Sequence, residues 1–168
     1  MKTELKRGDI SAAGRRFAIV VSKWNDTLTS KLHAGAVDAL TSVGAGEDLI
    51  DVFRVPGAFE LPLACLKAAT CGKFDAVIAL GVVIRGDTPH FDYVAGQAAS
   101  GIMQSSLNTG VPVMFGVITA DTLQQALDRC GEKSDNKGFE AALSAVEMVN
   151  TLAEIESLNL EKKISNVA

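Results

Sequence analysis

The sequence lacks the features that mark several large classes of protein. Its three cysteines are Cys65, Cys71 and Cys130, and none forms a C-x-x-C pair. An odd count without that spacing argues against a disulfide framework or a zinc site and suits a reducing cytoplasm. We therefore expect all three to be small core residues. No apolar run approaches the roughly 20 residues that span a bilayer. The charged N-terminus has no apolar core of a secretory signal, so we expect a cytoplasmic protein.

Charge and short motifs narrow the function further. The chain has 16 Lys and Arg against 20 Asp and Glu, a net charge of −4, and its only basic run is Lys162-Lys163. We therefore expect neither nucleic acid nor a membrane as a partner. The patterns G-x-x-x-x-G-K-[ST], G-x-G-x-x-G and H-E-x-x-H are all absent. Binding of nucleoside triphosphates or dinucleotides and metalloprotease chemistry thus lose their usual support.

What is present is an alternation of strand and helix patterns along 168 residues, of which 48% are hydrophobic. Patterns of buried strands cover 17–21, 49–55, 74–84 and 111–119, and a helical pattern follows each of them. This order predicts the α/β class, a three-layer α/β/α fold with a four-stranded parallel sheet. We expect one domain over 1–168, with 1–16 as an N-terminal extension and a frayed tail from about 159 to 168.

Several residues predict where the helices begin and end. Asp26 or Thr27 is expected to cap the helix after the first strand, and Gly44 to end it in a left-handed conformation. The helix over 89–107 is rich in Ala, Gly and Ser. We expect this small-residue face to be buried against a neighbour, whether another element or another subunit. A polar loop over 131–138 precedes the long final helix.

The most informative stretch is 76–94, AVIALGVVIRGDTPHFDYV. Its apolar first half reads as a strand buried on both faces. The polar residues Asp87, Thr88 and His90 follow, with Pro89 suited to the first turn of the next helix. Ligands bind at the carboxyl ends of strands in open parallel sheets. The sequence therefore predicts a binding site here, with backbone N–H groups for an anion and His90 for proton transfer.

Two other strand ends carry candidate residues. Trp24, beside Asn25, either stacks on a planar heterocycle or caps the core, and its position alone does not decide between them. In the segment 55–62, Glu60 either lines the site or is a favourable carboxylate in the first turn of a helix. Taken alone, neither Arg129 nor Lys137 indicates a site. Arg129, near a helix end, is most simply a partner of the helix dipole, and Lys137, in a loop, is most simply a solvated charge.

Five ordered segments of the chain resemble the lumazine synthase family. They are VVSKWNDTLTSKL, VPGAFELP, LGVVIRGDTPHFDYV, FGVIT and NKGFEAALSAVEMVN, and together they cover about residues 15–152. The resemblance implies a flavodoxin-like fold and an enzyme of riboflavin biosynthesis. Such an enzyme condenses 5-amino-6-(D-ribitylamino)uracil with 3,4-dihydroxy-2-butanone 4-phosphate, giving 6,7-dimethyl-8-ribityllumazine, phosphate and water. The resemblance implies no metal and no organic cofactor.

The resemblance also assigns roles to residues of this chain. It implies that His90 transfers protons and that Asp87, Thr88 and Arg129 bind the butanone phosphate, while Lys137 matches a lysine near the site. The residues implied to bind the aminouracil are Trp24, Asn25, Ala58, Phe59, Glu60, Val82, Val83, Ile84 and Phe115. Trp24 stands where many members have Phe, and Pro89 where many have Thr.

Alternatives remain at this point. A non-catalytic shell protein would hold a flavin or lumazine on Trp24, but it would need neither His90 nor the phosphate-binding pair Thr88 and Arg129. A flavodoxin-like electron carrier would need a Ser/Thr-rich loop after the first strand, which SKWND does not supply. The resemblance further implies a homopentamer, which in some members builds an icosahedral shell of sixty subunits. The loop GEKSDNKG is short, as in shell-forming members of that family, so the resemblance favours the shell.

Overall fold

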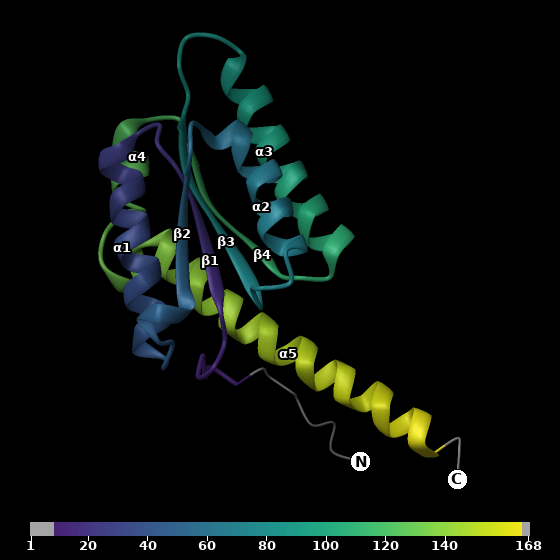
Figure 1. Ribbon diagram of the computed structural model, residues 1–168. Coiled ribbons are helices and arrows are strands. Elements are labelled where there is room, and N and C mark those ends of the chain that lie inside the picture. Colours follow the sequence, from purple (N-terminus) through teal and green to yellow (C-terminus); the bar gives the residue numbers. More distant parts are fainter. Residues whose placement is uncertain (1–8, 166–168) are drawn as a thin grey trace, which may run out of the picture.

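The computed structural model describes residues 9–165, with side chains through residue 158 (Figure 1). The strands are β1 (Phe17–Ser22), β2 (Ile50–Val55), β3 (Ala76–Ile84) and β4 (Val113–Ala120). The helices are α1 (Asp26–Ser42), α2 (Leu61–Thr70), α3 (His90–Thr109), α4 (Leu123–Leu127) and α5 (Lys137–Ser165). Three short 3-10 helices are η1 (Glu47–Leu49), η2 (Ala58–Glu60) and η3 (Lys133–Asp135).

The four strands form one parallel sheet in the order β2-β1-β3-β4, which confirms the predicted fold class. Phe17 of β1 pairs with Ile50 of β2 on one side and with Ala76 of β3 on the other. The connection from β1 leads to β2 at one edge, and the connection from β3 leads to β4 at the other. The carboxyl ends of β1 and β3 therefore form the topological switch point, where such sheets bind ligands.

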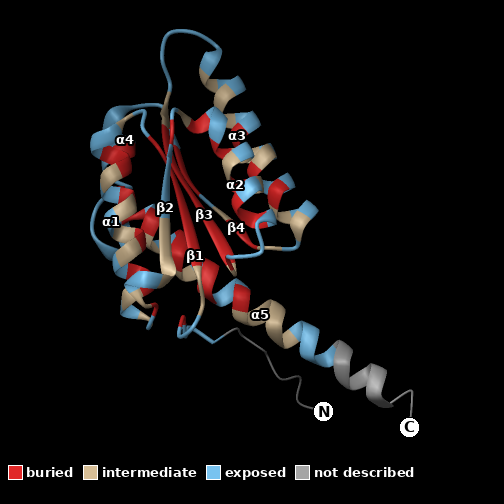
Figure 2. Ribbon diagram, in the orientation of Figure 1, coloured by how far each residue is buried: buried red, intermediate tan, exposed pale blue. Residues whose placement is uncertain are grey.

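Helices cover both faces of the sheet, α1, α4 and α5 on one side and α2 and α3 on the other (Figure 1). Alternate residues of a strand point to opposite faces. In β1, Phe17 and Ile19 therefore pack beneath α1 and α5, whereas Ala18 and Val20 pack beneath α2. Both central strands are buried almost throughout (Figure 2). This explains why their sequences are apolar runs without alternation.

Most predicted boundaries lie within two or three residues of the observed ones, and the differences have local causes. Neither Asp26 nor Thr27 caps α1, because Asn25 occupies the cap in a left-handed conformation with φ 60° and no side-chain cap bond. Gly44 does adopt the predicted left-handed conformation, with φ 97°. The final helix begins earlier than expected, at Lys137.

The predictions on the cysteines and on the two ends of the chain have mixed outcomes. Cys65 and Cys130 are buried, but Cys71 is exposed, so the prediction that all three cysteines lie in the core is wrong. Cys71 follows the last turn of α2, where the apolar face of that helix has already ended. Helix α5 is described through Ser165, and the rest of the expected tail, 166–168, lies outside the described residues, as do residues 1–8 of the expected extension.

Candidate active site at the carboxyl edge of the sheet

The loops after β1, β2 and β3 are joined to one another by hydrogen bonds. The amide N–H of Lys23 donates to the carbonyl of Val55 at 2.8 Å, and that of Trp24 to the carbonyl of Pro56 at 3.2 Å. The Nδ2 of Asn25 donates to the carbonyl of Val82 at 2.9 Å. These bonds hold the first loop against β2 on one side and β3 on the other. They assemble one surface at the switch point from three segments distant in sequence.

Trp24 projects from this surface into solvent. Its side chain is 74% exposed, so it does not cap the core of the chain. The backbone cause is Asn25, whose left-handed conformation turns the chain sharply just before α1. Asn is one of the few non-glycine residues that adopt this conformation readily. Of the two interpretations open from the sequence, the structure favours a free aromatic face that can stack on a planar ring.

The second loop contributes Ala58, Phe59 and Glu60, which form the 3-10 turn η2. Ala58 is buried, whereas Phe59 is 57% exposed. Glu60 is the acidic residue of η2 and the cap residue of α2, so it lies at the start of a helical segment, as one of the two interpretations predicts. Its carboxylate folds back over Gly57, where a Cβ would lie 3.0 Å from Oε2. The turn thereby places an exposed ring and a carboxylate side by side at the edge of the sheet.

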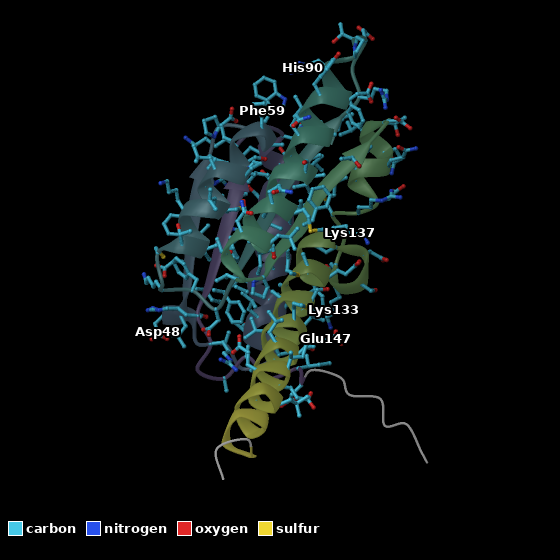
Figure 3. The ribbon with its side chains drawn as sticks, turned by 90° about the vertical axis from the view of Figure 1, so that its right-hand side faces the viewer. Asp48, Phe59, His90, Lys133, Lys137 and Glu147 are labelled. Atoms are coloured by element: carbon cyan, nitrogen blue, oxygen red, sulfur yellow. The ribbon has the colours of Figure 1, made fainter. Side chains whose placement is uncertain are left out.

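The third loop carries Asp87, Thr88 and His90, all exposed. Pro89 precedes α3 as its cap residue, and the His90 amide points to the Thr88 hydroxyl at 3.4 Å. Figure 3 shows His90 and Phe59 at the same end of the molecule. The structure thus brings together three predicted groups of different chemistry: a large aromatic, a carboxylate turn and an imidazole.

The three residues at the end of β3 differ in what they offer a ligand. Val82 is only 2% exposed, and its side chain belongs to the core beneath α1 and α5. Its carbonyl is already taken by Asn25. Val83 and Ile84 are half-buried, with Val83 on the α2 and α3 side.

Phe115, Arg129 and Lys137 lie apart from this surface, on the β4 side of the sheet. Phe115 is in the middle of edge strand β4, opposite Ala79, and is 45% exposed. The Arg129 carbonyl accepts from the Lys137 amide at 3.0 Å, so these two residues share one corner. Figure 3 shows Lys137 well below His90. Within the part of the chain that the structure describes, no hydrogen bond or ion pair joins this group to the three loops.

The cationic side chains of that corner have partners of their own. The Arg129 guanidinium donates to the Gln125 carbonyl at 2.9 Å, within α4 and its last turn. The Lys137 ammonium pairs with Glu140 at 2.6 Å, and both side chains are about half exposed. Exposed pairs of this kind are weak and exchange easily for another anion. Both cations are therefore available to a phosphate.

Sequence reasoning missed Asn136, which organises the same corner. It is 2% exposed, and its Nδ2 donates to the carbonyls of Lys31 at 3.0 Å and Gly131 at 2.9 Å. Its Oδ1 accepts from the amides of Gly138 and Phe139 and so caps α5. An Asn directly before a helical pattern is a recognised start signal, and it would have placed the helix start at 137.

Sequence reasoning also missed Arg85, at the base of the third loop. Its guanidinium pairs with Asp92 at 3.0 Å and with Asp121 at 2.8 Å. Their hydrogen bonds, that of Asp92 first, raise the pKa of Arg85 above its ordinary value. A comparable exposed pair, Arg54 with Asp26, lies beside the first loop and lowers the pKa of Asp26. No local sequence pattern predicts such ion pairs, because the two residues of a pair are distant in sequence.

Over the described part of the chain, no cluster of three or more His, Cys, Asp or Glu side chains is arranged to hold a metal ion. Among the helices in the same part, none is long and apolar enough to cross a membrane.

The fold and the site define a class. The chain is a flavodoxin-like α/β protein that presents an aromatic, a carboxylate and an imidazole at the switch point of its sheet. That is the usual place for a small-molecule site in such sheets.

Comparison with known proteins identifies the family. The sequence model of 6,7-dimethyl-8-ribityllumazine synthase matches residues 14–153. The 6,7-dimethyl-8-ribityllumazine synthase of Chlorobium chlorochromatii is 54% identical over 150 residues, 89% of this chain and 97% of the relative. That of Desulfatibacillum aliphaticivorans is 54% identical over 147 residues, 88% of this chain and 94% of the relative. The chain belongs to the 6,7-dimethyl-8-ribityllumazine synthase family, as its five segments predicted, and is a transferase of riboflavin biosynthesis.

Proposed function

We propose that the three hydrogen-bonded loops are the site at which 5-amino-6-(D-ribitylamino)uracil condenses with 3,4-dihydroxy-2-butanone 4-phosphate. The observation that carries the proposal is the convergence of exposed Trp24, Phe59 and His90 at the switch point. The pyrimidine stacks on Trp24, which offers a flat apolar face. Asn25 and the turn Ala58–Glu60 hold the ribityl chain and the ring edge, while Val83, Ile84 and the backbone at Val82 line the inner side.

The reaction needs protons moved at three points. The uracil amine attacks the ketone to give an imine, with loss of water. Phosphate then leaves by β-elimination, and ring closure expels a second water to complete the lumazine. An imidazole titrates near neutral pH and serves both as acid and as base. His90 fills this role, beside the loop that holds the phosphate. The substrates are already reactive, so holding them in line supplies most of the acceleration.

The phosphate is bound at the third loop, by the Thr88 hydroxyl and the backbone N–H groups of Asp87 and its neighbours, together with the guanidinium of Arg129. A guanidinium offers two parallel N–H groups to a phosphate. Lys137 adds a second positive charge beside Arg129. In the single chain, these two cations share a corner away from His90.

This separation supports a site shared between subunits. We infer a homopentameric ring in which Phe115, Arg129 and Lys137 of one chain complete the site on the three loops of the next. A ring repeats one head-to-tail interface, so each site takes residues from two chains. The exposed Phe115 on edge strand β4 suits burial in such an interface. Light scattering distinguishes a pentamer from a shell of sixty subunits. We place the enzyme in the cytoplasm, which the unpaired cysteines suit.

The proposal is tested by complementation of two impaired variants, His90→Ala and Arg129→Ala. Each alone is assayed for lumazine fluorescence with both substrates, and the two are then dissociated, mixed equally and reassembled. A site is intact where a chain with native His90 adjoins one with native Arg129. Random mixing should restore about a quarter of the sites, one half times one half. If both residues came from one chain, no activity would return. Reassembly is confirmed by light scattering, and untreated wild-type protein checks that the native site forms lumazine.

A further inference from the structure

Arg85 joins the two ends of the loop that holds Asp87 and Thr88. It directly follows β3, and the loop 86–89 leads from it into α3. Its Nη1 and Nη2 donate to the two carboxylate oxygens of Asp92, at 3.2 and 3.0 Å, in a bidentate pair. Asp92 lies in the first turn of α3, on the far side of the loop. The loop is thereby closed at its base by one guanidinium.

The same guanidinium reaches a third element and an aromatic ring. Its Nε donates to Asp121, directly after β4, at 2.8 Å, and its backbone N–H donates to the carbonyl of Ala120 at 2.9 Å. Its face lies over the ring of Phe91, with the guanidinium carbon 4.1 Å from the ring centre. The ends of β3 and β4 and the first turn of α3 are thus held together at Arg85. The two acids accept from three of its five N–H groups, and the ring covers one face of its plane.

The loop itself has few bonds that would fix it. It projects beyond the other loops of the sheet (Figure 1), and residues 86–89 are exposed. Its only side-chain hydrogen bond among the described residues is the long one from the His90 amide to Thr88, 3.4 Å. The position of this loop therefore depends on what holds its base. Single exposed ion pairs stabilise little, but a bidentate pair within a network is the exception.

We propose that Arg85 is a positioning residue for the phosphate end of the site. It holds the Asp87–Thr88 loop and the start of α3 at a fixed place relative to β4, and it does not itself bind substrate. This inference rests on the proposed function, because that function places the phosphate at this loop. Trp24, Asn25 and Phe59 lie on other loops. Replacement of Arg85 should therefore weaken binding of the butanone phosphate and leave binding of the aminouracil nearly unchanged.

The chain offers a matched control for the test. Lys73 also pairs with a carboxylate, that of half-buried Asp51 at 2.8 Å, and also lies over an aromatic ring, Phe74 at 5.2 Å. It precedes β3, at the opposite end of that strand from the site. Lys73→Met thus removes the same kinds of contact without touching the loop. Both KM values of Lys73→Met should equal those of the wild type.

The first experiment measures KM for each substrate by lumazine fluorescence. Arg85→Met should raise KM for the butanone phosphate about fivefold to tenfold, the change that loss of two exposed charge pairs supplies. KM for the aminouracil should change less than about twofold, and Arg85→Lys, which cannot form the bidentate pair, should lie between. Equal changes in both KM values, or changes matched by Lys73→Met, would overturn the proposal.

A second comparison separates positioning from direct binding of phosphate. In Asp92→Asn/Asp121→Asn, Arg85 keeps its charge but loses both ionic partners. A positioning role predicts a raised KM for the butanone phosphate, with little further loss when Arg85→Met is added, because the residues act as one unit. If Arg85 bound phosphate directly, freeing it would lower that KM, and the proposal would be wrong.

A third measurement does not depend on the reaction. Hydrogen exchange of the backbone amides of residues 86–88, 90 and 91 should be faster in Arg85→Met than in the wild type and unchanged in Lys73→Met. Unchanged exchange in Arg85→Met would overturn the positioning role. Thr88→Ala serves as the check on the proposed function. If it leaves KM for the butanone phosphate unaltered, the phosphate lies elsewhere, and the exchange result still decides whether Arg85 holds the loop.

Discussion

Replacing Asn136 with alanine is expected to lower the free energy of unfolding by about 3–5 kcal/mol. Asn136 is buried, and its amide group makes four hydrogen bonds, two as donor and two as acceptor. They connect α1, through the Lys31 carbonyl, to the loop after α4 and to the first turn of α5. Packing around the side chain is tight, since a Cβ on Gly35 would lie 2.5 Å from its Cγ.

The magnitude follows from the groups that lose partners. Loss of a helix cap costs about 0.5–2 kcal/mol. The carbonyls of Lys31 and Gly131 each lose a donor, at about 1–3 kcal/mol per buried unsatisfied group, with the lower part of that range applying where water reaches them. For a urea dependence of about 2 kcal/mol per molar, the midpoint of unfolding should fall by about 1.5–2.5 M.

The assay is urea unfolding followed by circular dichroism at one fixed protein concentration, because assembly makes apparent stability concentration-dependent. Asn150→Ala is the matched control. Asn150 also donates to two backbone carbonyls, those of Asp9 and Ser11, but at an exposed site. It should cost less than about 1 kcal/mol. If Asn136→Ala is no more destabilising than Asn150→Ala, the account of this corner is wrong.

Four further outcomes are expected. His90→Ala should lower kcat by up to about 100-fold with both KM values nearly unchanged, and full turnover by lumazine fluorescence would make His90 a bystander. Trp24→Ala should weaken aminouracil binding by about 0.5–1.5 kcal/mol, and an unchanged KM would reject stacking. Burial lowers the pKa of His33, whose Nε2 has no hydrogen-bond partner within the described part of the chain. The folded state thus binds a proton less tightly than the unfolded state, so stability should be full above about pH 6.5 and decline below it. His33→Gln should flatten that decline in urea titrations at several pH values. An unaltered decline would show that another group causes the loss of stability. In the native protein a thiol reagent should modify Cys71 rapidly and Cys65, whose pKa burial raises to about 12, only after unfolding; equal rates would contradict the observed burial.

Local patterns in the sequence determined the class of fold and the position of the main loop. The uncharged run at 76–84 predicted a strand buried on both faces, with the strand pattern starting at 74, and β3 covers Ala76–Ile84. The polar residues after it predicted a site at the carboxyl end of that strand, which is where the structure places Thr88 and His90. Both follow from properties of adjacent residues: hydrophobicity over a few positions and the chemistry of a chain reversal.

Only the tertiary structure decided what those residues contact. It showed Trp24 exposed rather than capping the core, and it joined Asn25 to Val82, 57 residues further along the chain. It brought Arg85 to Asp121 and tied Asn136 to Lys31, which lie 36 and 105 residues apart. No short-range pattern records such partners, because they meet only when the helices pack on the sheet. Burial and hydrogen bonding depend on that packing rather than on the neighbouring residues in the sequence.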